Sequence, residues 1–201
     1  MPDADDSALL SAWRAGDERS GQVLFERHYA AVFRFFSTKL GDATAADLTQ
    51  KTFLAIVRAA EPATVVQHVR AYLLTAARNQ LFMHFRQQGR RGTDDELGST
   101  SVVSLAPSPE SNLAADEHEQ RLLAALRALP LEQQMLLELY YFEQLGTEAL
   151  AEVLQVPRGT VKSRLSRARA AARDAYEAAS PQGHGSIDDL EQWAQRLRDA
   201  R

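Results

Sequence analysis

The stretch TEALAEVLQVPRGTVKSRLSRARAAAR, residues 147–173, decides the fold of this chain. Its apolar spacing predicts a short helix over 147–154 and a tight break at 155–157. Pro157 suits the first turn of a new helix, because that position needs no backbone N–H. The stretch 158–173 holds six basic residues and no acidic residue. Two helices around a tight turn, the second with a basic outer face, form a helix-turn-helix, whose second helix enters the major groove of DNA.

The basic block has a second interpretation, as the solvated face of an ordinary helical hairpin. The whole chain carries a formal net charge of −4, but phosphate contacts are local and depend on the block rather than on the average. Hydroxyl groups and arginines at the start of the second helix can reach base edges, and later arginines can hold phosphates. The short break, the proline and the six cations together favour DNA binding.

Apolar residues at helical spacing cover most of the remaining chain, and no alternating strand pattern occurs. The stretch 87–112 is rich in Gly, Ser, Pro and acidic residues, which is typical of a flexible linker. These patterns predict an all-α fold of two small helical bundles joined by a flexible linker, with the helix-turn-helix in the second bundle. Helices are expected at 7–15, 18–40, 44–61, near 69–88, from 113 to 129, from 131 to 145, and at 147–154, 158–178 and 187–199.

The predicted boundaries are 1–90 for the first bundle, 91–112 for an acidic linker, 113–178 for the second bundle and 179–201 for a tail. One ridge in the first bundle has a spacing of four residues, and its apolar side chains are expected in the core. It consists of Val69, Leu73, Ala77, Leu81 and Phe85. The tail is expected to form a short amphipathic helix with Ile187, Leu190, Trp193 and Leu197 on one face.

Composition excludes several classes of function. The 201 residues are 45% hydrophobic, enough for a core, and contain no cysteine, which excludes disulfides and thiolate sites and suits a reducing compartment. The acidic N-terminus does not resemble a signal peptide, and no apolar run is long enough to span a membrane, so a cytoplasmic protein without membrane contact is expected. The sequence shows no phosphate loop, metal-ligand spacing or nucleophilic triad, so it predicts no enzyme, no cofactor and no metal site.

Two segments resemble the conserved regions of a bacterial sigma factor. Residues 129–171, LPLEQQMLLELYYFEQLGTEALAEVLQVPRGTVKSRLSRARAA, resemble the fourth region, and residues 9–58 with 70–91 resemble the second region. Only these two regions are present, with a linker between them, which is the layout of the extracytoplasmic-function (ECF) type. The resemblance implies a factor that binds core RNA polymerase, directs it to promoter DNA and regulates transcription.

The resemblance also implies which residues act. The fourth region would read the upstream (minus-thirty-five) duplex with Arg158, Thr160, Lys162, Ser163, Arg164 and Arg167. The second region would capture the unpaired downstream (minus-ten) strand with Arg70, Tyr72, Thr75, Arg78, Asn79 and His84, because aromatic and cationic groups suit single-stranded DNA. Burial of Tyr72 in the bundle is the alternative for that residue. Core polymerase would be bound by Asp47, Leu48, Gln50, Lys51 and Phe53.

One departure from the family pattern concerns charge on the polymerase-binding helix. Family members usually carry an acidic cluster there, whereas this chain reads TAADLTQKTF over 44–53 and keeps only Asp47. Drift with compensation elsewhere is one explanation. The other is that phosphorylation supplies the charge, as in ECF groups that lack the cluster and resemble kinase-controlled factors. The candidates are Thr52, favoured for its direction on the helix, then Thr49, and Thr44, which is expected to be the N-cap.

Two other functions remain open at this point. A conventional helix-turn-helix regulator would act without replacing sigma and would normally dimerise. An adaptor would have lost polymerase binding together with the acidic cluster. A Ser/Thr kinase and an anti-sigma factor are the further candidate partners. Gln155 stands where the family usually has Gly in the turn.

Overall fold

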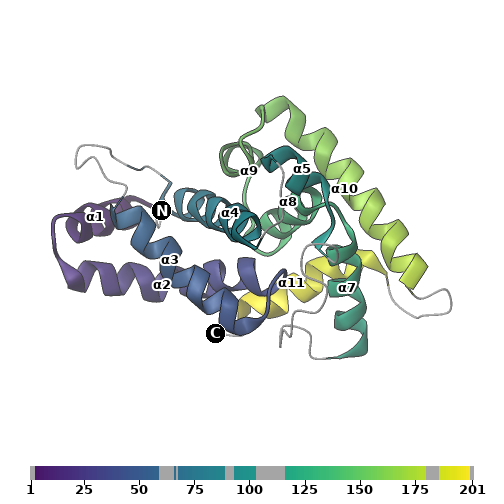
Figure 1. The fold of residues 1–201 in the computed structure, drawn as a ribbon, viewed down its shortest axis with the longest axis horizontal. Helices are drawn as coiled ribbons and strands as arrows, with labels where there is room; N and C mark the ends of the chain where they lie inside the picture. Colours follow the sequence, from purple (N-terminus) through teal and green to yellow (C-terminus); the bar gives the residue numbers. More distant parts are fainter. Residues whose placement is uncertain are drawn as a thin grey trace.

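The computed structural model describes residues 3–58, 66, 68–88, 93–102, 116–179 and 186–199. Within these ranges the regular elements are helices and no strand occurs, which confirms the all-α prediction. The first bundle contains α1 (Asp3–Arg14), α2 (Glu18–Ser37), α3 (Asp42–Arg58) and α4 (Val69–Gln87). The remaining helices are α5 (Asp94–Ser99), α7 (Glu117–Ala128), α8 (Leu131–Tyr141), α9 (Thr147–Leu154), α10 (Arg158–Ala179), the 3₁₀ turn η1 (Ile187–Asp189) and α11 (Leu190–Asp199). Figure 1 shows α1–α3 at one end of the molecule, α10 at the other, and α4 between them.

The core of the first bundle follows the apolar spacing. All five members of the predicted α4 ridge, from Val69 to Phe85, are fully buried. The helix packs against α1, α2 and α3. Asp17 caps α2 by accepting a hydrogen bond from the backbone N–H of Arg19 at 3.1 Å, which satisfies one of the free donors at the helix start.

A buried polar pair fixes α1 on this bundle. The Asp6 carboxylate, 1% exposed, lies 2.7 Å from Nε2 of His28 and is also paired with Arg27. Burial lowers the pKa of His28, and the contact with Asp6 opposes that effect.

The second bundle contains the predicted helix-turn-helix. Helix α9 has the predicted bounds and buries Leu150, Val153 and Leu154, and α10 buries Val161, Leu165 and Ala168. Between them Gln155 adopts the left-handed conformation, with φ 55° and ψ 43°. This is the position where the family usually has Gly, because a Cβ is strained there.

Replacing Gln155 by Gly is expected to stabilise the second bundle by about 0.5–1 kcal/mol, since the left-handed strain outweighs the added freedom of the unfolded chain. Urea unfolding followed by far-UV circular dichroism measures the change. Gln155→Ala is the control: it removes the same amide but keeps the strained Cβ, so it should not stabilise. Equal stabilisation by both variants would show that backbone strain is not the cause.

The structure corrects two expectations about the first half of the chain. Helix α3 begins at Asp42, so Thr44 lies inside the first turn and is not the N-cap. Part of the expected flexible linker is ordered, because Thr93 and Glu96 form a capping box that starts α5, and Leu97 and Val102 are buried. The spacing of Thr93 and Glu96 was the sequence signal for this helix. The rest of the linker, 91–92 and 103–112, and the expected helix end at 61 lie outside the described residues.

The two bundles pack directly against each other, which the sequence did not predict. Helix α4 of the first bundle lies against α9 of the second. Helix α11 packs on α8, and Figure 1 shows it running from the second bundle towards the first. Among the described residues, no helix is both long and apolar enough to span a membrane.

Candidate nucleic-acid interface

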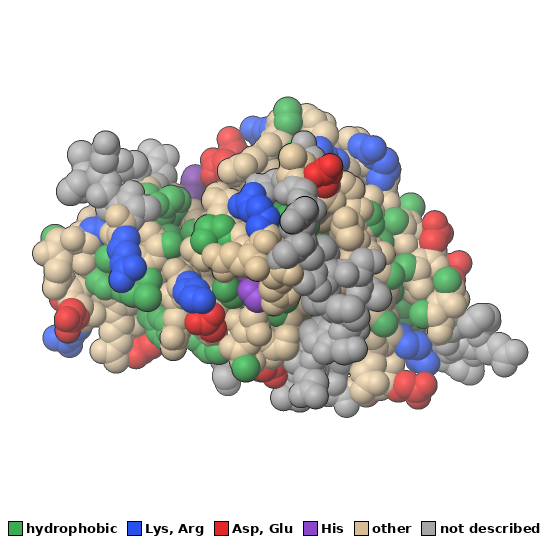
Figure 2. Space-filling view, in the orientation of Figure 1, with side chains coloured by type: hydrophobic (Ala, Val, Ile, Leu, Met, Phe, Trp, Pro, Cys, Tyr) green, Lys and Arg blue, Asp and Glu red, His purple; other side chains and the backbone are tan. Residues whose placement is uncertain are grey.

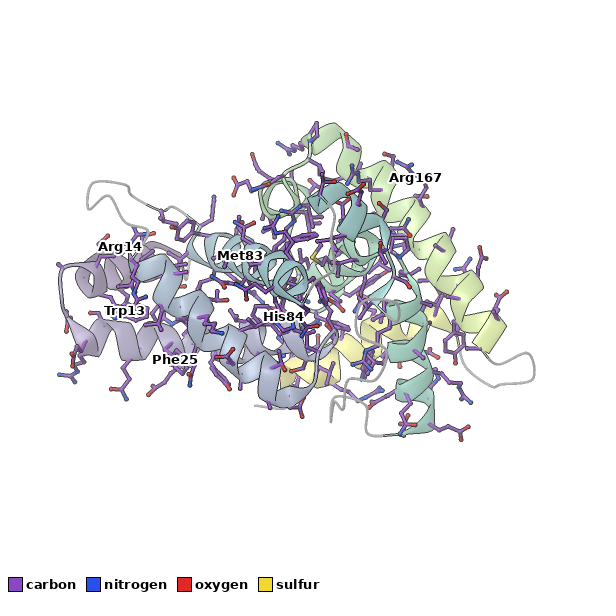
Figure 3. The ribbon with its side chains drawn as sticks, viewed as in Figure 1. Trp13, Arg14, Phe25, Met83, His84 and Arg167 are labelled. Carbon is purple, nitrogen blue, oxygen red and sulfur yellow. The ribbon has the colours of Figure 1, made fainter. Side chains whose placement is uncertain are left out.

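The outer face of α10 carries the residues assigned to duplex DNA. Arg158, Lys162, Ser163 and Arg167 are exposed, while Thr160 and Arg164 are half-buried. Figure 3 shows Arg167 pointing away from the body of the molecule, and Figure 2 shows basic side chains over the beginning of this helix. The turn at Gln155 therefore presents the N-terminal half of α10 outwards, as duplex binding requires.

The cations on this face differ in how they are balanced. Arg164 pairs with Glu132 at 3.0 Å and Arg158 approaches Glu148 at 3.6 Å. Within the described part of the chain, Lys162 and Arg167 have no acidic partner, although Arg167 Nε donates to the Ser163 carbonyl at 3.3 Å. These two side chains carry the uncompensated charge that a phosphate would meet first.

The residues assigned to single-stranded DNA do not form one open face of α4. Asn79 is exposed, and Thr75 is half-buried and donates to the carbonyl of Ala71 at 2.9 Å. Tyr72 is half-buried, with the guanidinium of Arg14 at 5.7 Å from its ring centre. His84 is half-buried, and its Nε2 lies 2.9 Å from the side-chain amide of Gln88.

The two arginines of that set are held by the second bundle. Arg70 pairs with Glu143, in the turn between α8 and α9. Arg78 is 5% exposed, lies over the ring of Phe82 at 4.6 Å and reaches Gln155 at 3.5 Å. In this arrangement the cations that would track phosphate on the promoter strand contact the protein itself.

The expected polymerase surface on α3 is smaller than predicted. Asp47, Gln50 and Lys51 are exposed, but Leu48 and Phe53 are buried in the core at 3% and 2% exposed. These two are therefore core residues, because they lie on the inner side of an amphipathic helix. The surviving acid is also neutralised, since Lys51 Nζ lies 2.7 Å from the Asp47 carboxylate.

Three large apolar residues in the described part of the chain are exposed, which the sequence pattern did not predict: Val23 of α2, at 38%, and one residue each on α3 and α4. Leu54 is 49% exposed and lies one turn after Lys51 on α3, and Met83 is 43% exposed on α4 (Figure 3). Apolar residues are predicted to be buried in the core unless another signal contradicts it, so exposed ones are missed. The only available signal for Leu54 was its position one turn from the polar residues Gln50 and Lys51.

The three candidate threonines differ in accessibility. Thr49 and Thr52 are fully buried, and their hydroxyls donate to the carbonyls of Ala45 and Leu48 at 2.7 and 2.8 Å. Thr44 is half-buried in the first turn of α3. The preference for Thr52 is therefore corrected: its side chain points into the bundle and not towards the surface of Asp47.

Comparison with known proteins matches both bundles. Residues 24–91 match the family described as "Sigma-70 region 2", and residues 119–171 match "Sigma-70, region 4". The chain is 28% identical over 175 residues to RNA polymerase sigma-H factor of Pseudomonas aeruginosa, covering 83% of this chain and 91% of that protein. It is 24% identical over 174 residues to the ECF RNA polymerase sigma-E factor of Escherichia coli, with 83% and 91% covered.

A solved structure shows the same fold. CnrH, in its complex with the cytosolic domain of CnrY, aligns with a TM-score of 0.61 over 87% of this chain and 98% of that chain, at 21% identity. Region 2 precedes region 4 in this chain, as in the family, and the match to the ECF sigma-E factor spans 91% of that protein. Region 4 contains the helix-turn-helix, whose second helix has an exposed basic face. The chain therefore belongs to the sigma-70 family, as a sigma factor of the ECF type.

Proposed function

We propose that this sigma factor directs core RNA polymerase to promoters through three separate surfaces. Helix α10 reads the upstream duplex, α4 captures the unpaired downstream strand, and α3 binds the polymerase. The observation that carries the proposal is the outer face of α10, the second helix of the helix-turn-helix. Lys162 and Arg167 are exposed there and pair with no acid among the residues that the structure describes.

Run-off transcription tests the proposal. Bacterial core RNA polymerase with the purified chain should initiate at defined positions, whereas core polymerase alone should not. A conventional regulator cannot substitute for sigma, so initiation that requires a second sigma factor would favour that alternative. Co-elution of the chain with core polymerase on gel filtration would distinguish a sigma factor from a DNA-binding protein that does not bind core polymerase.

The α3 surface supports a charge-based switch. Asp47 and Lys51 cancel each other, so this surface lacks the net negative charge that a basic partner surface would attract. Thr44 lies three residues before Asp47, on the same side of the helix, and is the only one of the three candidates that is not fully buried. A phosphate there would add nearly two negative charges close to a helix N-terminus, where negative charge is favoured. We infer that a Ser/Thr kinase activates the protein at Thr44.

Thr44→Glu is expected to strengthen binding to core polymerase by about five- to tenfold, because it restores negative charge beside Asp47. Fluorescence anisotropy of labelled protein titrated with core polymerase measures the change. Ala46→Glu is the matched control, since Ala46 is half-buried like Thr44 but lies two residues after it, on a different side of the helix. Equal effects of both variants, or a phosphate mapped by mass spectrometry to Thr52, would contradict the assignment to Thr44.

A further inference from the structure

A buried carboxylate joins the two bundles. Glu143 is 3% exposed and lies in the turn that follows α8. Its Oε1 accepts hydrogen bonds from Nε and Nη2 of Arg34, at 3.0 and 2.8 Å, and its Oε2 accepts from Arg70. Both arginines belong to region 2, so one glutamate of region 4 is held by two cations of the other domain.

The C-terminal helix closes the same junction. Trp193 of α11 is fully buried and packs edge-on against Phe142, with 5.4 Å between the ring centres. At the end of α11 the carbonyl of Leu197 accepts a hydrogen bond from Nη1 of Arg34 at 3.0 Å. A cation at a helix C-terminus also interacts favourably with the helix dipole. Arg34 thus ties together α2, the Glu143 turn and α11, which lies beyond the region 4 match at residues 119–171.

This closed arrangement cannot serve both promoter elements at once. The promoter elements at minus ten and minus thirty-five lie about 25 base pairs apart. This separation is roughly 85 Å along straight duplex, at about 3.4 Å per base pair. Helix α4 is in contact with α9, and α9 leads into the recognition helix through a tight turn. The two DNA-binding helices are therefore far closer than the two elements, and the domains must separate before both can be bound.

The same contacts occupy the two arginines of the α4 surface, although Asn79 remains exposed. Arg70 is occupied by Glu143, and Arg78 is buried beside Gln155. The junction contains the ion pairs of Glu143 with Arg34 and Arg70. A buried ion pair is a weak source of net stability, because desolvation offsets most of the attraction. Such a contact can be released by a partner that binds the open form more tightly.

We propose that the free protein is autoinhibited, with Glu143 and α11 forming a latch that holds region 4 over the α4 surface. The latch opens when core polymerase binds the separated domains. The consequence for the promoter strand rests on the proposed function of α4, whereas the latch itself depends only on the contacts described above. Because the closed form cannot bind the strand, its population lowers the apparent affinity of the free protein by the closed fraction.

Distance measurements on the full chain test the latch. The sequence has no cysteine, so spin labels can be placed uniquely at Arg19→Cys in α2 and Ala178→Cys in α10, both exposed. Electron spin resonance should give a narrow distance distribution for the otherwise unchanged chain. Glu143→Gln should give a longer and broader distribution, since it removes the charge that both arginines bind. Glu152→Gln, which neutralises an exposed glutamate of α9, should leave the distribution unchanged.

A second variant and a binding measurement complete the test. Deletion of residues 186–201 removes α11 without touching Glu143 and should open the chain in the same way, with circular dichroism verifying that both proteins remain helical. Binding to a fluorescein-labelled random 12-nucleotide single strand should tighten about tenfold in both variants if the closed form holds roughly nine-tenths of the population. Unchanged distances in both variants would overturn the latch. Opening without any gain in strand binding would support the latch and contradict the assignment of α4.

Discussion

Replacing Lys39 by Met is expected to weaken the contact between regions 2 and 4 by about 3–5 kcal/mol, because it leaves a buried carboxylate without its cation. Lys39 follows α2 and is completely buried, where its ammonium pairs with Glu138 of α8. The ammonium also donates to the carbonyl of Phe35 at 2.6 Å. Burial lowers the pKa of Lys39 and Glu138 opposes that shift, as expected for a cation that has lost its water and kept one charged partner.

Two tryptophans make this loss visible, because Trp13 lies in the first bundle and Trp193 packs on the second. In the parent chain, urea should unfold both bundles in one transition. In Lys39→Met, the two bundles should unfold at different urea concentrations. The fluorescence of Trp193, measured in a Trp13→Phe background, should then change at a different urea concentration from the far-UV circular dichroism of the whole chain.

The double variant Lys39→Met/Glu138→Gln is the control. It replaces both charges, while the introduced amide can still contact Gln134, which donates to the Glu138 carboxylate at 2.6 Å in the parent chain. Removing both members of a buried ion pair costs far less than removing one, so most of the lost free energy should return. A single variant as stable as the parent chain would show that this pair does not join the domains.

The double variant Lys162→Ala/Arg167→Ala is expected to weaken binding to the upstream duplex about 100-fold, at about 1–2 kcal/mol for each basic contact. The two side chains are exposed on α10 and, among the described residues, face no acidic partner, so they are available to the DNA backbone. If both contact phosphates, the slope of log K against log salt should also become shallower by about two.

Fluorescence anisotropy on a duplex selected from a random pool, repeated at several salt concentrations, measures both quantities. Arg173→Ala is the matched control on the same helix, because Arg173 lies near the C-terminal end of α10 and pairs with Asp188 at 3.2 Å. Its effect should be small. An equal loss for the control, or an unchanged salt slope in the double variant, would show that the first half of α10 does not contact DNA.

The helices could be predicted from the sequence because their apolar residues repeat at helical spacing. The α4 ridge and the inward residues of α9 and α10 lie where that spacing places them. The helix-turn-helix could be predicted equally well, since a break of three residues with Pro157 leaves few other arrangements of the two helices. Exposure of Lys162 and Arg167 followed from the same periodicity, because both lie outside the apolar stripe of Val161, Leu165 and Ala168.

The contact between the domains could not be predicted in the same way. It depends on Arg34, Lys39, Glu138 and Glu143, and charged side chains normally indicate a solvated surface. Their pairing joins positions 99 to 109 residues apart, for which local spacing gives no signal. Burial of Thr49 and Thr52 was missed for a related reason: each hydroxyl is satisfied by a carbonyl four residues earlier, which lets a polar side chain enter the core.

The most direct test of promoter recognition by two separate surfaces is start-site mapping on a promoter library randomised around both elements, with core polymerase and this chain. We expect active promoters to share one sequence near minus thirty-five and another near minus ten. Lys162→Ala/Arg167→Ala should remove the requirement for the upstream sequence alone. Starts that are independent of both sequences, or that occur equally with core polymerase alone, would contradict promoter recognition by this protein.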